Sequence, residues 1–150
     1  VSTITEKSVQ DTSKVRTVLE CMAIDSAVFP LSEAKLQELE RIDREQHELI
    51  VTHPEDNLRF AELDKEFHCA IAECCDNASL IEFIQSINNV MVRFNVLSGT
   101  LPQNRQDALI EHENIIAFLK KGQREFAKVA LSEHLKHVEE RMLSESKKER

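Results

Sequence analysis

Four side chains that could bind a metal fall on the apolar faces of three predicted helices. Within residues 56–75, Asp64 and His68 are four positions apart, so they lie one turn apart on the same helix face. His112 and His134 take central positions on the apolar faces of two later segments. A buried carboxylate and buried imidazoles are costly unless they are paired or coordinated. Three His nitrogens and one Asp oxygen suit Zn, Ni, Fe, Mn or Co, so the pattern predicts a divalent metal site.

Each of these side chains also has a simpler interpretation. A single His on an apolar face is more often a hydrogen-bonded core residue than a ligand, and Asp64 and His68 could bond only to each other. The metal interpretation therefore depends on all four residues together. Of the remaining histidines, His53 is expected at a helix end, and His47 and His137 at the surface. His137 is expected to approach the ligands from outside.

Length and composition limit the possible folds. The chain has 150 residues, 41% of them hydrophobic, with only 2 Gly and 3 Pro and neither Trp nor Tyr. This composition indicates one globular domain and argues against a turn-rich β-sandwich or barrel. The net charge of −8 disfavours direct binding to phosphate backbones. No apolar run approaches the ~20 residues that span a bilayer.

The cysteines predict a reduced, cytoplasmic setting. None is in a C-x-x-C pair, and all fall inside predicted helices, where a thiol usually acts as a small buried hydrophobe. They are Cys21, Cys69, Cys74 and Cys75. A redox role for the adjacent pair is left open.

Apolar periodicity predicts an all-α fold. Ser32 is a candidate N-cap, Ser79 and Glu82 have capping-box spacing, and Gly122 has the place of a C-terminal glycine. The expected helices are residues 11–28, 32–52, 56–75, 79 onward, 103–121 and 124–144. Short connections between such helices indicate an antiparallel bundle. The fourth helix has the clearest apolar face, made of Leu80, Phe83, Ile84, Ile87, Val90, Met91, Phe94 and Leu97.

Several short motifs resemble one known family. Residues 63–72 carry the D-x-x-F-H-x-x-[IL]-A signature of the FCD domain, the C-terminal effector domain of FadR-type regulators in the GntR superfamily. Residues 16–20 resemble its R-x-x-[IL]-E opening, and residues 132–135 its closing x-x-H-L. Three other family motifs match with one difference each. Ala78 replaces the Pro of N-P-x-L, Phe118 replaces the last Ala of E-H-x-x-I-x-x-A, and Gln123 replaces the Asp of G-D-x-x-x-A. The resemblance runs from about Val15 to Leu143.

The resemblance implies six or seven helices around a ligand or metal pocket. In the metal-binding branch of the family, the motif ligands correspond here to Asp64, His68, His112 and His134. Effectors of the family are typically small carboxylates, such as hydroxy acids, dicarboxylates or sugar acids. Residues 11–150 would form the effector domain, and the polar residues 1–10 would be the remnant of a linker. DNA would be bound only through an N-terminal winged helix-turn-helix domain absent from this chain, and the protein would be a homodimer.

An arginine is expected to hold the carboxylate of the effector, because the guanidinium fork matches that group. Arg93 is the first candidate, Arg16 the second and Arg105 the third. Two other functions remain open, a metal-dependent hydrolytic enzyme and a bundle that a metal only stabilises. No general base is evident on the apolar faces, which favours regulation over catalysis.

Overall fold

The computed structural model describes residues 4–98 and 102–148 and confirms the all-α prediction. The described residues form six helices and no strand. These helices are α1 (Glu6–Ser26), α2 (Glu33–Thr52), α3 (Asn57–Ala72), α4 (Ala78–Ser98), α5 (Pro102–Lys120) and α6 (Arg124–Lys148). None of the described helices has an apolar stretch long and hydrophobic enough to cross a bilayer.

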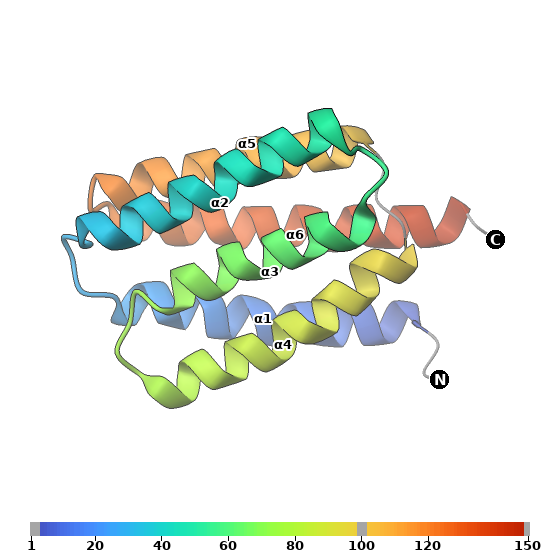
Figure 1. Ribbon diagram of the computed structural model, residues 1–150. Helices are drawn as coiled ribbons and strands as arrows, with labels where there is room; N and C mark the ends of the chain where they lie inside the picture. Colours follow the sequence, from blue (N-terminus) through green and yellow to red (C-terminus); the bar gives the residue numbers. More distant parts are fainter. Residues whose placement is uncertain (1–3, 99–101, 149–150) are drawn as a thin grey trace.

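Successive helices run in opposite directions, and together they close a ring (Figure 1). Around this ring, α1 packs on α6, α6 on α5, α5 on α2, α2 on α3, α3 on α4, and α4 on α1. The contact of α1 with α3 crosses the interior. Side chains from α1, α2, α3, α5 and α6 can therefore meet inside the ring.

Local capping explains where the helices begin. Thr5 and Ser8 form a capping box, so α1 begins at Glu6, and residues 6–10 are helical rather than part of the expected linker. Ser32 caps α2 as predicted, since its side chain accepts a hydrogen bond from the Lys35 amide. For α4 the predicted cap is wrong. The Asn77 side chain accepts from the Leu80 amide, so this helix begins before Ser79.

The core is apolar at both ends and polar between them. The larger apolar cluster joins the C-terminal parts of α3 and α5 to the N-terminal part of α6, for example through Ile71, Leu119 and Leu131. A smaller cluster at the other end joins Val9 of α1 to Met142 of α6. Buried polar side chains lie between these clusters, near the middle of several helices. They include Arg16, Glu20, Gln46, Asp64, His68, Asn88, His112 and His134.

The apolar face predicted for α4 is only partly buried. Leu80, Ile84, Met91 and Phe94 are in the core as expected. Phe83 is 63% exposed.

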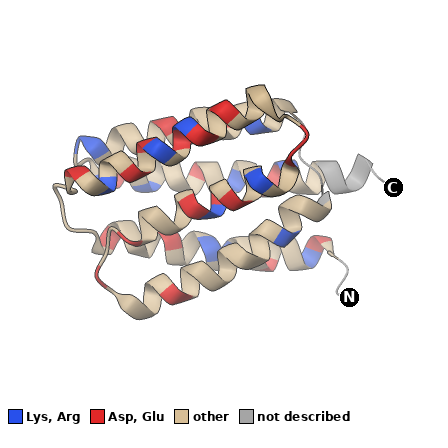
Figure 2. Cartoon of the chain, viewed as in Figure 1, with Lys and Arg blue, Asp and Glu red and all other residues tan. Residues whose placement is uncertain are grey.

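Charged residues alternate in sign along the outer faces of α2 and α3 (Figure 2). Arg41 of α2 pairs with Glu66 of α3, and Arg59 of α3 pairs with Glu45 of α2. These pairs bridge the two helices at the surface, where each pair contributes little to stability.

Candidate metal centre

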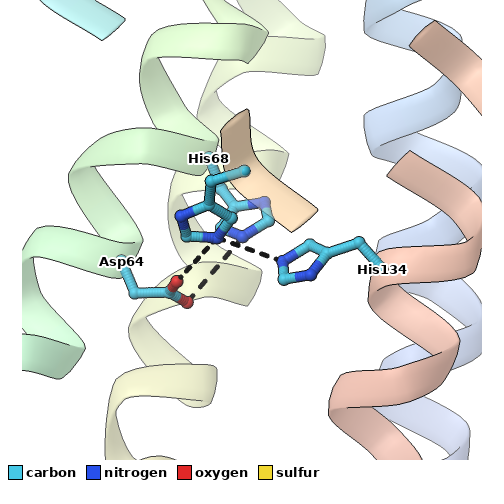
Figure 3. A group of neighbouring side chains, drawn as sticks. Asp64, His68 and His134 are labelled. Atoms are coloured by element: carbon cyan, nitrogen blue, oxygen red, sulfur yellow. Dashed lines mark hydrogen bonds and ion pairs between the residues drawn. The ribbon is translucent and has the colours of Figure 1, made fainter. Parts of the chain in front are cut away.

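Three helices bring the predicted ligands together inside the ring. Helix α3 supplies Asp64 and His68, α5 supplies His112, and α6 supplies His134. One possible ligand atom from each of these residues lies within 4.8 Å of the others, and all four residues are buried. The side chains of Asp64, His68 and His134 point toward one another (Figure 3). We call these four residues the His–Asp cluster.

The Nε2 atoms of the three imidazoles face the interior of the His–Asp cluster. His112 Nε2 lies 3.2 Å from Asp64 Oδ1 and 3.2 Å from His134 Nε2. His68 Nε2 is 3.8 Å from Asp64 Oδ2 and has no hydrogen-bond partner among the described residues, although it is buried. A buried polar atom without a partner needs an explanation, and a bound cation would provide one.

The opposite nitrogen of each imidazole is bonded to an outer acceptor, a side-chain oxygen from another helix. His68 Nδ1 is 2.5 Å from Glu20 of α1, and His134 Nδ1 is 2.6 Å from Glu111 of α5. His112 Nδ1 is 3.1 Å from Gln46 Oε1 of α2.

These outer acceptors determine which nitrogen of each imidazole carries the proton. An ionised carboxylate only accepts hydrogen bonds, so the Nδ1 atoms of His68 and His134 carry the hydrogen. The Nε2 lone pairs then point inward, as they do in histidines that bind a metal. With Gln46 Oε1 as the acceptor, His112 has the same tautomer. Two lone pairs 3.2 Å apart, on His112 and His134, repel each other unless a proton or a cation lies between them. The residues therefore fit a divalent metal.

Burial keeps His68 and His134 neutral and therefore able to coordinate. Burial lowers the pKa of His134 to about 3, against the opposing hydrogen bond to Glu111. It also lowers the pKa of His68, although the charge of Glu20 acts in the other direction. Burial would raise the pKa of Asp64, but His68, His112 and Arg16 together lower it, so this group is a carboxylate. The cluster thus offers three imidazole nitrogens and one anionic oxygen.

Arg16 is buried beside the His–Asp cluster. Its Nε donates to Glu20 over 2.7 Å, its Nη2 donates to Asn88 over 3.0 Å, and Nη2 lies 4.0 Å from Asp64 Oδ2. Burial would raise the pKa of Glu20, but His68 and Arg16 lower it to about 2. Glu20 is therefore ionised and joins the arginine to a candidate ligand.

The other two candidate arginines lie elsewhere. Arg93 is exposed on α4, so the structure does not bring it to the cluster. Arg105 is buried, donates to the Pro54 carbonyl and lies over the Phe60 ring, with 5.4 Å from its guanidinium carbon to the ring centroid. It is located two turns before His112 on α5.

The aromatic ring of Phe67 packs against one face of the His112 ring. Their centroids are 4.0 Å apart and their planes differ by 13°. Phe67 is fully buried and belongs to the larger apolar cluster. It therefore limits the rotation of the His112 ring and connects the His–Asp cluster to the larger apolar cluster.

Sequence reasoning missed the outer acceptors as such. Glu20 is part of the motif at residues 16–20, but the sequence did not identify it as a partner of a histidine. Gln46 lies on the apolar face of its helix and was not identified as a site residue. Asn88 was passed over in the same way. Gln46 follows Leu39 and Ile42 at helical spacing, so a polar residue at a core position was a usable signal. Glu111 is next to His112 in the sequence and is therefore offset by about 100° from the apolar face, yet one of its carboxylate oxygens bonds to His134.

A second group of metal-binding residue types lies at the surface, between α2 and α5. His47 Nε2 is 2.6 Å from Glu113 Oε1 and 3.7 Å from Asp43 Oδ1. The side chains of Asp43, His47 and Glu113 are 14%, 44% and 50% exposed. We call these three residues the surface cluster, and its contacts are those of a His–carboxylate ion pair.

Comparison with known protein families decides the class of the chain. The FCD domain matches residues 11–137, which are most of the sequence. The chain belongs to the FCD domain family. Residues 64–72, which carry the first family signature, lie on α3 of this FCD domain and supply two of the four clustered side chains.

A curated relative of this FCD domain is the HTH-type transcriptional regulator YdhC of Bacillus subtilis strain 168. The two are 27% identical over an alignment length of 145, and the match covers 92% of this chain and 64% of the relative. The chain thus spans less than two thirds of the length of that regulator.

Two solved structures share the fold. A GntR-family transcriptional regulator from Pseudomonas syringae pv. tomato DC3000 matches with a TM-score of 0.75 and 19% identity, over 98% of this chain and 61% of that one. The metal-free FCD domain of TM0439 matches with a TM-score of 0.74 and 20% identity, over 98% and 99%. The Bacillus relative and the Pseudomonas protein are both described as transcriptional regulators.

Proposed function

We propose that this chain is the effector-sensing, metal-binding domain of a cytoplasmic bacterial regulator of the GntR type. The proposed effector is a small carboxylate, and the proposed protein is a homodimer. The regulator would contact DNA through an N-terminal domain, and the Bacillus relative is named an HTH-type regulator. The inward-facing nitrogens of the His–Asp cluster are the observation that carries this proposal.

The donor set favours a transition metal over Mg or Ca. Imidazole suits Zn and Ni as well as Fe, Mn and Co, whereas Mg and Ca prefer oxygen ligands. We propose Zn or Ni, held by Asp64, His68, His112 and His134. Because the imidazoles are neutral, one carboxylate would leave a divalent ion with a net charge near +1. Such an ion, when bound, would supply positive charge to attract a carboxylate. The metal-free description of the TM0439 domain is consistent with a role for metal in the family.

Arg16 is the proposed effector arginine, because it is buried and lies 4.0 Å from Asp64. Its bond to Glu20 holds the guanidinium in place beside the cluster. Arg105, also buried, is the second candidate. The exposed position of Arg93 makes it a matched control, although it was the first candidate from the sequence.

Metal content tests the first part of the proposal. Tag-free protein is analysed by mass spectrometry beside the double variant His112→Ala, His134→Ala, before and after incubation with Zn or Ni. About one metal per chain, lost in the double variant, would support the site. No metal in either protein, even after incubation, would overturn it.

Small-molecule binding tests the second part. A panel of small carboxylates is screened by thermal shift against the metal-loaded protein, and hits are measured by calorimetry. Arg93→Ala should bind the hit as the wild type does, while Arg16→Lys should bind it less tightly. Metal without carboxylate binding would instead support a purely structural metal, and turnover of a bound compound would support an enzyme.

Regulation requires that the effector favour one arrangement of the dimer. A ligand that bound all arrangements equally would shift none of them. In a full regulator, the favoured arrangement would set the spacing between two DNA-reading helices. Sedimentation of this chain with and without a hit would test both the dimer and its response.

A further inference from the structure

The outer acceptors of the His–Asp cluster differ in their contact with solvent. The Glu20 side chain is 1% exposed, and Gln46 is 0% exposed. Glu111 is 18% exposed. Of the three outer acceptors, Glu111 thus has the most contact with water, so the connection between the cluster and the surface is on the α5–α6 side.

Glu111 holds three side chains of α6 at once. His134 Nδ1 donates to its Oε1 over 2.6 Å, and His137 Nδ1 lies 2.9 Å from Oε2. Arg141 donates to both oxygens, over 3.1 Å from Nη1 to Oε1 and over a shorter distance from Nη2 to Oε2. His134, His137 and Arg141 are separated by three and four residues, so they lie on one face of α6.

Three of these four side chains line a surface cavity of about 350 Å³ between α5 and α6. Its walls include Glu111, His137 and Arg141. A continuous set of hydrogen bonds therefore leads from this cavity, through one carboxylate, to the Nδ1 of a buried imidazole. The inner nitrogen of that imidazole lies in the His–Asp cluster.

A carboxylate that accepts from Nδ1–H has two effects on such an imidazole. It fixes the tautomer and the ring orientation, and it raises the basicity of the opposite nitrogen. Arg141 holds the Glu111 carboxylate from the other side, so the position of this carboxylate depends on a side chain that is 20% exposed.

We propose that Glu111 is a positioning residue that sets how tightly His134 holds the metal, and that Arg141 makes this affinity adjustable from the protein surface. This inference rests on the proposed function, because it requires that the His–Asp cluster bind a metal.

The test is the dissociation constant of Zn and Ni for the isosteric variant Glu111→Gln, measured against a competing chelator. Loss of an outer carboxylate weakens metal binding by about 10- to 100-fold in comparable sites. Glu133→Gln is the matched control, because Glu133 precedes His134 and is exposed, and its substitution removes the same charge. Arg141→Met should weaken binding by less, on the order of 3-fold, because the Glu111–His134 bond remains.

Two further measurements separate positioning from a general loss of structure. The visible spectrum of the Co-loaded Glu111→Gln variant should shift, and its unfolding temperature in chelator should stay close to that of the wild type. If Glu111→Gln lowers that temperature but binds metal as Glu133→Gln does, the inference is wrong, although the proposed function stands. If the wild type itself binds no metal, the proposed function fails, and this inference fails with it.

Discussion

The His–Asp cluster and the surface cluster each include an Asp and a His four positions apart on one helix, yet they differ in the direction of their histidine nitrogens. In the His–Asp cluster the Nδ1 atoms are bonded outward and the Nε2 atoms face inward. In the surface cluster, His47 uses its Nε2 to contact both carboxylates. Of the two clusters, the His–Asp cluster is the one whose histidines are held by outer acceptors and direct Nε2 lone pairs at its centre.

Burial separates the two clusters further. A carboxylate in the interior must be paired or coordinated, whereas a surface carboxylate is already solvated. Glu113 is half exposed, so it gains little from an added cation. The His–Asp cluster, in contrast, includes a buried nitrogen with no partner among the described residues. Metal binding should consequently depend on the His–Asp cluster alone.

The largest expected effect is the loss of metal binding in His68→Ala. This change removes one ligand outright, so it should weaken the affinity for Zn by more than the ~100-fold expected of an outer acceptor. His47→Ala is the matched control, and its metal content should equal that of the wild type. Mass spectrometry of the loaded proteins measures both. A proportional loss of metal in His47→Ala would show that the surface cluster binds metal too.

The next largest expected effect is a loss of folding stability in the variant Arg16→Met. This substitution leaves Glu20 buried without its cation, and breaking a buried pair costs about 3–5 kcal/mol. Arg41→Met removes surface ion pairs with Glu38 and Glu45 and should cost no more than about 1 kcal/mol. Urea unfolding of the metal-free proteins gives both values. Similar costs for the two variants would contradict the difference between interior and surface.

Acid should destabilise the metal-free protein through the His–Asp cluster. His134 has a folded pKa of about 3 and an ordinary value of 6.5, so the unfolded chain takes up the proton first as the pH falls. Stability is therefore retained above pH 6.5 and declines below it, by up to about 1.4 kcal/mol per pH unit for each such histidine. Below pH 4.5, protonation of Glu20 adds to the loss, because its folded pKa is about 2.

Unfolding in chelator between pH 7 and 4 measures this slope. His134→Gln should show a shallower slope than the wild type. A wild-type stability that does not change with pH over this range would contradict the burial of neutral imidazoles.

Much of the fold and the inner part of the site could be predicted from the sequence. Long helices with apolar periodicity are local features, and a polar residue such as His112 at a central core position is visible in the same pattern. The beginning of α1 was missed because the Thr5–Ser8 capping box was not recognised.

The outer part of the site could not be predicted in the same way. Gln46 and His112 are 66 residues apart, and their bond depends on how α2 packs against α5. The position of Arg93 could not be predicted either, although it depends only on the rotation of one helix. One residue corresponds to about 100° of rotation, so a position next to the apolar face can point to solvent.

The smallest expected effect is that of His47→Ala on stability. The ring is 44% exposed and its partner Glu113 is 50% exposed, so water replaces most of what the ion pair provides. The free energy of unfolding should change by less than about 1 kcal/mol in this variant, and less still at high salt. Urea unfolding at low and high salt measures the change. A loss as large as that in Arg16→Met would mean that the surface cluster holds α2 against α5. The two clusters would then differ in the direction of their histidine nitrogens but not in their contribution to stability.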